Sequence, residues 1–359
     1  MFNTRKGKNI YKLQLELENL YPDSKVVILN SARAGIIIAL KVFQQKKPQC
    51  KEVIIPEFIC DSVPNVIKKM GLTPIYGPVG ADLNLQVSAL NHLCNENTLA
   101  VILPHMYAKP AKIVEADELL TKRGIFLIDD AAQVSGIGIE NKALGSWGDV
   151  GLLSFAQAKT IVTGVRASGG VMFINNKSLI KNIYPFVELL PDCQSRISSL
   201  VHFLLAYKWH GVSRQLDYYL QRIKHKFFSH TIIDNYSPIT RISNLDAGIA
   251  LAQFNSLKLR IEKTSFIISN FKTMLEDNHR FEIVQAQAQY LSRLIIQSKE
   301  LSPDKLKQKL KAKGIVTKFV YGTGSKPYDG AHLSGLIELP LQNLNDKQLK
   351  YIINILKTV

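Results

Sequence analysis

The first 175 residues alternate short, almost wholly apolar runs with helical patterns, and this alternation restricts the fold more than any other feature. The strand-like runs are Val26–Leu29, Glu52–Ile55, Thr73–Tyr76, Leu99–Leu103, Ile125–Ile128, Gly151–Phe155 and Gly170–Ile174. Helical patterns occur between them at Ala34–Phe43, Val63–Met70 and Lys112–Arg123. Continuous apolar strands separated by helices are typical of a parallel sheet covered on both faces. The sequence therefore predicts the α/β class, with a mostly parallel central sheet in a large domain over residues 1–235.

The rest of the chain predicts a small α+β domain over residues 236–359. A chain of 359 residues is long enough for one large and one small domain. The expected elements of the small domain are helix Leu245–Leu275, strand Tyr290–Gln297, helix Pro303–Lys313, strand Gly314–Tyr321 and helix Asp346–Leu356.

Residues 198–228 form a long helical stretch that is both aromatic and basic. Its apolar residues recur at spacings near three and four, as on an amphipathic helix. Its cations are Lys208, Arg214, Arg222, Lys224 and Lys226. This pattern suits peripheral contact with a membrane or a lipid-linked substrate, and equally a stripe that packs on its own domain or on a second subunit. The net charge of +16 suits anionic small molecules, membrane surfaces or nucleic acid, and charge alone does not choose among them.

The four cysteines form no CxxC pair and have no nearby histidine at metal-ligand spacing. They indicate a reducing compartment and argue against a disulfide scaffold or a structural zinc site. The amino-terminal residues lack the apolar core of a signal peptide, and no run of about 18 apolar residues exists. We therefore expect a cytoplasmic protein without a bound metal.

Charged residues gather where two of the predicted strands end. Asp129 and Asp130 close the run Ile125–Ile128, at the sheet edge where open α/β proteins bind ligands, and Lys159 follows the run Gly151–Phe155. A lysine that faces a buried carboxylate is what Schiff-base chemistry requires, because the amine is the nucleophile and the carboxylate keeps a pyridine nitrogen protonated. Each of these features alone is weak evidence for this chemistry, since paired aspartates often bind metal or cap a helix, and a single lysine usually lies at the surface.

Further motifs accompany these residues in a fixed order along the chain. They are Ser31-Ala32-Arg33-Ala34-Gly35, Leu103-Pro104-His105-Met106-Tyr107-Ala108, Asp129-Asp130-Ala131-Ala132-Gln133, Ser154-Phe155 with Lys159, Gly169-Gly170, Arg241–Ala247, Ala250–Gln253 and Glu338–Leu341. Together they resemble the sugar aminotransferase family DegT/DnrJ/EryC1/StrS, within the fold-type I enzymes that use pyridoxal 5'-phosphate (PLP). The similarity covers nearly the whole chain.

The resemblance implies a role for each matching residue. Lys159 would bind PLP covalently and shuttle the proton of the reaction, Asp130 would pair with the protonated ring nitrogen, and Gln133 would contact the phenolic oxygen. Ser154 and the turn Ser31-Ala32-Arg33 would hold the phosphate. That turn opens a helix, and the N–H groups of a helix N-terminus bind anions.

Four positions depart from the family pattern. Arg33 stands where the family has threonine, and Cys60 stands where an aromatic residue covers the cofactor face, a role that Phe58 could take over. Ile239 replaces an asparagine that reaches the phosphate of the partner subunit. Tyr321-Gly322-Thr323 lacks the histidine of the family's substrate motif. These changes suggest a substrate unlike the usual nucleotide-linked keto-sugar.

The resemblance implies a PLP-dependent aminotransferase of sugar or polysaccharide biosynthesis. It would move an amino group from glutamate or glutamine to an anionic keto-sugar or related keto metabolite, as a homodimer and without nucleic acid. Related sugar dehydratases carry histidine at the position of Lys159, which argues against that reaction. His105 is interpreted as a structural residue. The alternative is a non-catalytic relative that binds PLP or an anion for regulation or assembly.

Overall fold

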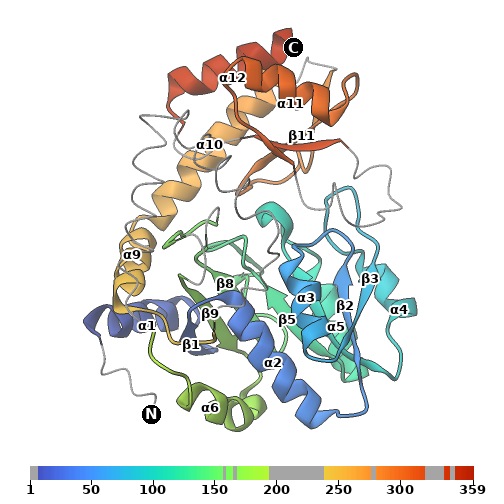
Figure 1. Cartoon of the computed structure of the whole chain (residues 1–359), viewed down its shortest axis with the longest axis vertical. Helices are drawn as coiled ribbons and strands as arrows, with labels where there is room; N and C mark the ends of the chain where they lie inside the picture. The colour runs from blue at the N-terminus through green and yellow to red at the C-terminus, as the bar shows by residue number, and fades with distance from the viewer. Residues whose placement is uncertain are drawn as a thin grey trace, which may run out of the picture.

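The structure is a computed structural model that describes residues 7–156, 159–164, 168–193, 238–275, 280–319, 335–339 and 344–359. It contains a seven-stranded sheet in the lower part of Figure 1 and a four-stranded sheet in the upper part. The basic stretch at 198–228 and the Tyr321-Gly322-Thr323 motif lie outside the described residues. Within the described part of the chain, no helix combines the length and apolarity needed to span a bilayer.

The large sheet has the order β1-β9-β8-β5-β4-β2-β3. Its strands are β1 (Lys25–Leu29), β2 (Glu52–Pro56), β3 (Thr73–Gly77), β4 (Thr98–Pro104), β5 (Phe126–Asp130), β8 (Val150–Ser154) and β9 (Gly170–Ile174). Strand β9 is antiparallel to both of its neighbours, and the other six strands run parallel to one another. The predicted α/β class with a mostly parallel sheet is therefore confirmed. A short hairpin follows β5, formed by β6 (Gly138–Ile139) and β7 (Lys142–Ala143).

Helices cover both faces of this sheet (Figure 1). They are α1 (Lys8–Leu20), α2 (Ala32–Lys46), α3 (Ser62–Lys69), α4 (Leu90–Leu93), α5 (Ile113–Arg123) and α6 (Ile180–Glu188), with 3-10 turns at Val87–Ala89, Met106–Ala108 and Lys177–Leu179. One core contains α1 and α5, and a second contains α2, α3 and α6. Helix α1 was not predicted, although Leu13 and Leu17 are fully buried in the first core.

The single helix predicted at Leu245–Leu275 is two helices, α9 (Asn244–Phe254) and α10 (Leu257–Leu275). The buried side of α9 joins the first core through Ala247 and Ala250. The second half of α10 joins a third core through Ile267 and Phe271. The start of α10 still packs on the first core through Leu257 and Ile261, so α10 itself connects the two cores, and Figure 1 shows it running from one sheet to the other. The domain boundary expected at residue 235 stays a prediction.

The small sheet is antiparallel, in the order β10-β11-β13-β12. Its strands are β10 (Phe281–Ile283), β11 (Leu294–Ser298), β12 (Lys318–Phe319) and β13 (Leu336–Leu339), and its helices are α11 (Pro303–Ala312) and α12 (Asp346–Thr358). Strands β10 and β13 were not predicted. The strand expected from Tyr290 was wrong at its start, because residues 290–293 form a loop and β11 begins at Leu294.

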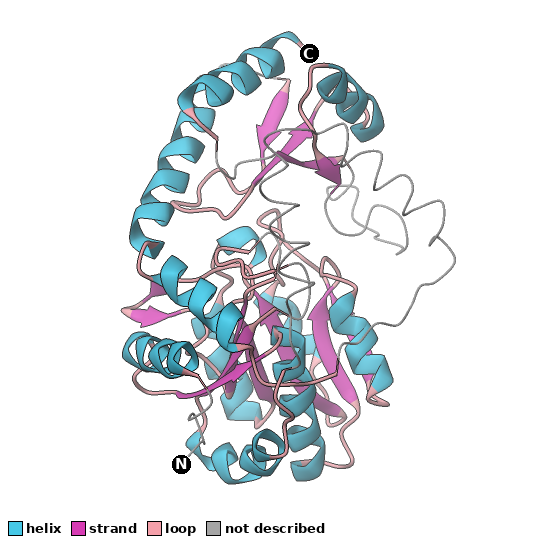
Figure 2. Ribbon diagram, turned by 60° about the vertical axis from the view of Figure 1, so that its left-hand side comes forward, coloured by secondary structure: helices cyan, strands magenta, loops and turns pink. Residues whose placement is uncertain are grey.

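The small sheet contacts the loops that follow the parallel strands (Figure 2). Phe58 after β2 and Tyr107 after β4 share a buried cluster with Val284, Ile295 and Leu336. This cluster fixes the small sheet over the carboxyl ends of β2 and β4. Ligand sites of open α/β sheets lie at this edge, so the small sheet forms part of any site there.

Candidate active site

A fully buried histidine–carboxylate pair lies at the end of β5. Asp129 Oδ1 lies 2.7 Å from His105 Nε2, and both side chains are 0% exposed. His105 Nδ1 accepts a hydrogen bond from Ala111 N at 3.0 Å, so Nε2 carries the proton that faces Asp129. The second oxygen of Asp129 accepts from the backbone N–H groups of Gly145 and Trp147, at 2.6 and 3.0 Å. The hydrogen-bonding groups of both side chains are therefore engaged, which agrees with the structural interpretation of His105.

Asp130 is buried next to this pair, and its carboxylate has a different hydrogen-bond partner. Its Oδ1 accepts a hydrogen bond from Ala132 N at 3.0 Å. Burial raises the pKa of Asp130, while the positive charge of Lys159 and the Ala132 hydrogen bond act to lower it. Its backbone carbonyl accepts from His105 N at 3.3 Å, so the buried pair also braces the backbone of Asp130.

Lys159 lies in a turn after β8, where its backbone N–H donates to the carbonyl of Ala156. Burial lowers the pKa of Lys159, and the charge of Arg293 lowers it further, while Asp130, Cys60 and Glu338 act to raise it. A lowered lysine pKa increases the fraction of neutral amine, which is the nucleophilic form. The structure thus brings the buried Asp130 and the partly buried Lys159 into one site, at the sheet edge that the sequence predicted.

The turn that carries Lys159 is held from two sides. Gln253 of α9 forms two hydrogen bonds with the backbone of Val162. It accepts from the N–H at 3.0 Å and donates to the carbonyl at 2.7 Å. Thr160 donates to the carbonyl of Gln133 at 3.3 Å, and its side chain lies next to that of Tyr290. These contacts fix the lysine turn between the first core and the small sheet.

The N-terminus of α2 opens toward the same edge. Ser31 caps the helix by accepting a hydrogen bond from Ala34 N at 3.2 Å. Strand β9 places Gly170 opposite Ser154, and a Cβ atom at Gly170 would lie 2.3 Å from Ala32 N. Only glycine lets the first turn of α2 approach the sheet this closely. The helix N-terminus and Ser154 therefore lie on either side of Gly170, and the backbone N–H groups of a helix N-terminus can bind an anion.

The positions that depart from the family pattern fall on different sides of this site. Arg33 is partly buried in the first turn of α2, and Cys60 is close enough to Lys159 to affect its pKa. The ring of Phe58 is fully buried against Tyr107, with 6.3 Å between the ring centroids. Phe58 therefore packs in the buried cluster under the small sheet. Ile239 packs against the second core.

Gln133 and Tyr107 connect the end of β5 to the loop after β4. Gln133 Oε1 accepts a hydrogen bond from Tyr107 N at 3.1 Å. Tyr107 and Ala108 have φ angles of 53° and 72°, in the left-handed region that residues other than glycine rarely adopt. The carbonyl of Tyr107 accepts from Ser292 N at 2.8 Å. Strained backbone of this kind persists where surrounding contacts hold it, as they do here.

Arg293 and Glu338 of the small sheet are site residues that the sequence did not reveal. Their side chains form an ion pair of 2.7 Å and are 12% and 15% exposed. After burial, the charge of Arg293 is the largest influence on the pKa of Lys159. The available signal was a charged residue inside each of two apolar runs, Leu291–Ile296 and Leu336–Leu339.

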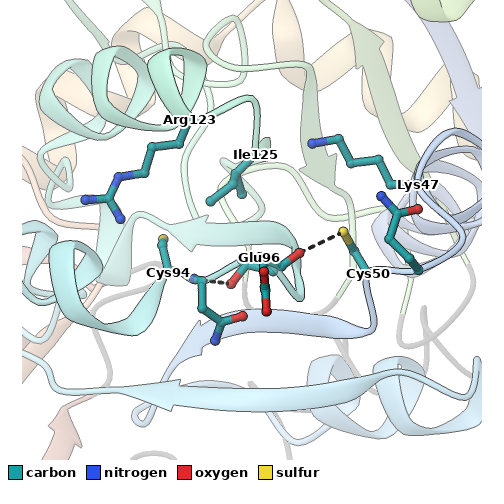
Figure 3. Close-up of a pocket in the computed structure, with 9 residues that line it drawn as sticks. Lys47, Cys50, Cys94, Glu96, Arg123 and Ile125 are labelled. Carbon is teal, nitrogen blue, oxygen red and sulfur yellow. Dashed lines mark hydrogen bonds between the residues drawn. The ribbon is translucent and has the colours of Figure 1, made fainter.

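A separate pocket lies at the opposite end of the strands (Figure 3). It is lined by Lys47, Gln49, Cys50, Cys94, Asn95, Glu96, Thr98, Arg123 and Ile125. These residues precede or begin β2, β4 and β5, or end α2 and α5. Cys50 is hydrogen-bonded there to the carbonyl of Glu96 at 3.3 Å. This pocket is therefore distinct from the site at Asp130 and Lys159.

Comparison with protein families gives one match that covers most of the chain. Residues 2–334 match the model of the DegT/DnrJ/EryC1/StrS aminotransferase family. GDP-perosamine synthase of Vibrio cholerae is 27% identical over 176 residues, which are 49% of this chain and 47% of that protein. GDP-perosamine synthase of Escherichia coli O157:H7 is 34% identical over 131 residues, 36% of this chain and 35% of that protein. Each alignment thus spans less than half of the relative's length.

Solved structures share the fold over nearly the whole chain. PseC of Helicobacter pylori, an aminotransferase involved in the biosynthesis of pseudoaminic acid, aligns with a TM-score of 0.75 and 18% identity, covering 98% of this chain and 91% of that one. The putative sugar aminotransferase Spr1654 of Streptococcus pneumoniae, in its PMP form, aligns with a TM-score of 0.75 and 19% identity, covering 98% and 92%. The PLP aminotransferase-like fold expected from the sequence is confirmed.

Proposed function

Because the chain belongs to the DegT/DnrJ/EryC1/StrS aminotransferase family, we propose that it is a PLP-dependent aminotransferase. It transfers the amino group of an amino acid to a keto-sugar or a related keto metabolite. The observation that carries this proposal is that the partly buried Lys159 and the buried Asp130 are close enough for each charge to shift the pKa of the other, at the sheet edge where α2 begins.

The residues present fit the three reactive parts of PLP. Lys159 offers a largely desolvated amine for the aldehyde, and Asp130 offers a buried carboxylate for the pyridine nitrogen. Ser154 and the first turn of α2, at Ser31-Ala32-Arg33, offer an anion site for the phosphate. When bound, PLP supplies an electron sink that stabilises negative charge on the carbon bearing the amino group.

The electrostatics of the site suit these roles. When Lys159 is neutral, the buried carboxylate of Asp130 no longer has beside it the positive charge that acts on it most strongly. The protonated pyridine nitrogen of a bound cofactor would restore that pairing, and Asp130 would hold the ring proton in place. The amine of Lys159 would be the group that takes up and returns the proton of the substrate carbon.

Gln133 contributes to orientation. Its Oε1 accepts from Tyr107 N, and its amide nitrogen lies 3.5 Å from Met106 Sδ. A thioether is a weak acceptor, so the amide nitrogen is the group that would donate to the phenolic oxygen of PLP.

The amino donor in this proposal is glutamate or glutamine, and the acceptor is an anionic keto-sugar of sugar or polysaccharide biosynthesis. The names of the curated relatives and the net charge of +16 support an anionic acceptor. We include in the proposal a homodimer in the cytoplasm that does not bind nucleic acid. Peripheral membrane contact through residues 198–228 stays an untested prediction.

A screen of amino donors tests the proposed function. The purified protein is loaded with PLP, and its visible absorbance is recorded before and after addition of each of the twenty standard amino acids. We expect a bound chromophore that at least one amino acid converts to the amino form of the cofactor. Lys159→Ala should abolish the band of the bound chromophore, and the exposed control Lys177→Ala should retain it.

Two other outcomes count against the proposal. A stable chromophore that no amino acid converts would favour the non-catalytic alternative. The absence of any bound chromophore in the wild type would exclude both PLP-based functions.

A further inference from the structure

The loop formed by residues 290–293 lies against the candidate active site. The buried side chain of Tyr290 lies next to that of Thr160, the residue that follows Lys159. Ser292 N donates to the carbonyl of Tyr107 at 2.8 Å. Two contacts in three residues therefore fix this loop on the walls of the site, and Arg293 follows directly.

Arg293 carries a mostly buried guanidinium whose charge acts on Lys159. Its ion pair with Glu338 measures 2.7 Å, and its side chain is 12% exposed. Glu338 lies on β13 opposite Ile295, two residues after Arg293, so the small sheet positions both members of the pair. The field of Arg293 reaches Lys159, where it disfavours the ammonium form.

A buried ion pair is weak support for stability, because desolvating the two charges offsets much of their attraction. The repulsion between Arg293 and a protonated Lys159 is a further unfavourable contribution to the free energy. Such an arrangement suits an anionic ligand, whose charge offsets both cations. The planar fork of a guanidinium also matches a carboxylate in a bidentate geometry.

We propose that Arg293 binds the α-carboxylate of the amino-acid donor and that Glu338 holds the guanidinium in place when no donor is bound. This inference rests on the proposed function. With PLP bound, the donor nitrogen would replace the Lys159 amine, and the α-carboxylate of the donor is bonded to the carbon next to that nitrogen. The α-carboxylate therefore comes within the range over which Arg293 acts on Lys159.

The acceptor half of the reaction has a different requirement. A keto-sugar carries no carboxylate on its reacting carbon, so Arg293 has no corresponding group to bind. Glu338 repels a donor carboxylate that approaches the same guanidinium. Removal of Arg293 should therefore weaken donor binding, and removal of the charge of Glu338 should strengthen it.

Donor binding in three variants tests this inference. Protein loaded with PLP is titrated with L-glutamate, L-glutamine and L-alanine, and the apparent dissociation constant is read from the rate of the absorbance change. We expect Arg293→Gln to raise this constant about 10- to 100-fold for all three donors, the loss typical of hydrogen bonds to a charged group. Glu338→Gln should lower it a few-fold. The control Arg280→Gln, which breaks an exposed ion pair with Glu300 in the same sheet, should leave it unchanged.

The absorbance band of bound PLP separates the possible failures. A wild type without this band contradicts the proposed function itself. If the wild type binds PLP and reacts, and Arg293→Gln leaves the apparent dissociation constant for the donor unchanged, the inference about Arg293 is overturned and the proposed function stands. A purely structural ion pair predicts that Arg293→Gln and Glu338→Gln both weaken donor binding, which also overturns it. A loss confined to L-glutamate would assign Arg293 to the side-chain carboxylate and contradict the α-carboxylate assignment.

Discussion

The chain has 45 lysine and arginine residues, and its composition does not distinguish Lys159 from the others. The chemistry of Lys159 comes from its surroundings. Burial and Arg293 lower its pKa, and Asp130 limits that change. The family motifs identified Lys159 and Asp130 from the sequence, because each follows a strand pattern at a fixed spacing. Arg293 and Glu338 could not be found in this way, since they lie 45 residues apart and only the antiparallel sheet pairs them.

The pH dependence of PLP capture follows from these charges. The rate at which the protein binds PLP covalently should rise with pH through an apparent pKa below the ordinary lysine value of 10.5, because the neutral amine attacks. Asp130→Asn removes a charge that raises the pKa of Lys159, so the profile of this variant should shift to lower pH. Stopped-flow absorbance over a series of pH values measures both profiles. A shift to higher pH in Asp130→Asn would contradict the assigned electrostatics.

The buried pair of His105 and Asp129 supports a second prediction at this scale. Asp129→Asn should reduce the free energy of unfolding by about 1.5–3 kcal/mol, because an amide cannot accept both from His105 Nε2 and from the N–H groups of Gly145 and Trp147, so a buried donor loses its charged partner. Urea denaturation of the protein without PLP provides the measurement. Glu300→Gln, which breaks an exposed pair with Arg280, should change the free energy of unfolding by less than about 1 kcal/mol. Equal effects of the two substitutions would show that the buried pair is not a structural support.

At the scale of elements, the close approach of α2 to β9 shapes the candidate phosphate site. A Cβ at Gly170 would lie 2.3 Å from Ala32 N and 2.4 Å from the carbonyl carbon of Ser31, which is closer than real contacts allow. Gly170→Ala should therefore displace the first turn of α2 and raise the dissociation constant for PLP at least ~10-fold, the loss of roughly one charge-assisted hydrogen bond.

Equilibrium titration with PLP measures this effect. The matched control is Gly71→Ala, where an added Cβ meets no atom within 4 Å but the φ angle of +70° is unfavourable. This control should lose some stability and keep its affinity for PLP. An unchanged PLP affinity in Gly170→Ala would remove the N-terminus of α2 from the phosphate site.

Strand patterns predicted the large sheet well, because its strands other than the edge strand β3 are buried on both faces and read as continuous apolar runs. The small sheet was harder to predict. Strands β10 and β13 have only three and four residues, too short for a periodicity to emerge. Neither glycine nor proline marks the break between α9 and α10, and α10 itself passes from the first core at Leu257 to the third core at Ile267. The loop at residues 290–293 is apolar enough to resemble a strand, yet it contacts Tyr107 and Thr160.

At the scale of the whole molecule, the candidate site lies where the small sheet meets the carboxyl ends of the parallel strands. Gln285 donates hydrogen bonds to the carbonyls of Asp82 and Met106, and the cluster around Phe58 and Tyr107 closes the same junction. Asp130 and Lys159 come from one part, and Arg293 and Glu338 from the other. A covalent bond to PLP should therefore form at one lysine of the folded chain and at none of the surface lysines.

Reductive trapping tests this central claim most directly. The folded protein is mixed with an equimolar amount of PLP, treated with borohydride, digested and examined by peptide mass spectrometry. The account predicts one dominant modified peptide containing Lys159, with the label lost in Lys159→Ala and retained in Lys177→Ala. Label spread over several exposed lysines, or a dominant label on another lysine, would contradict the assignment of Lys159 as the cofactor lysine.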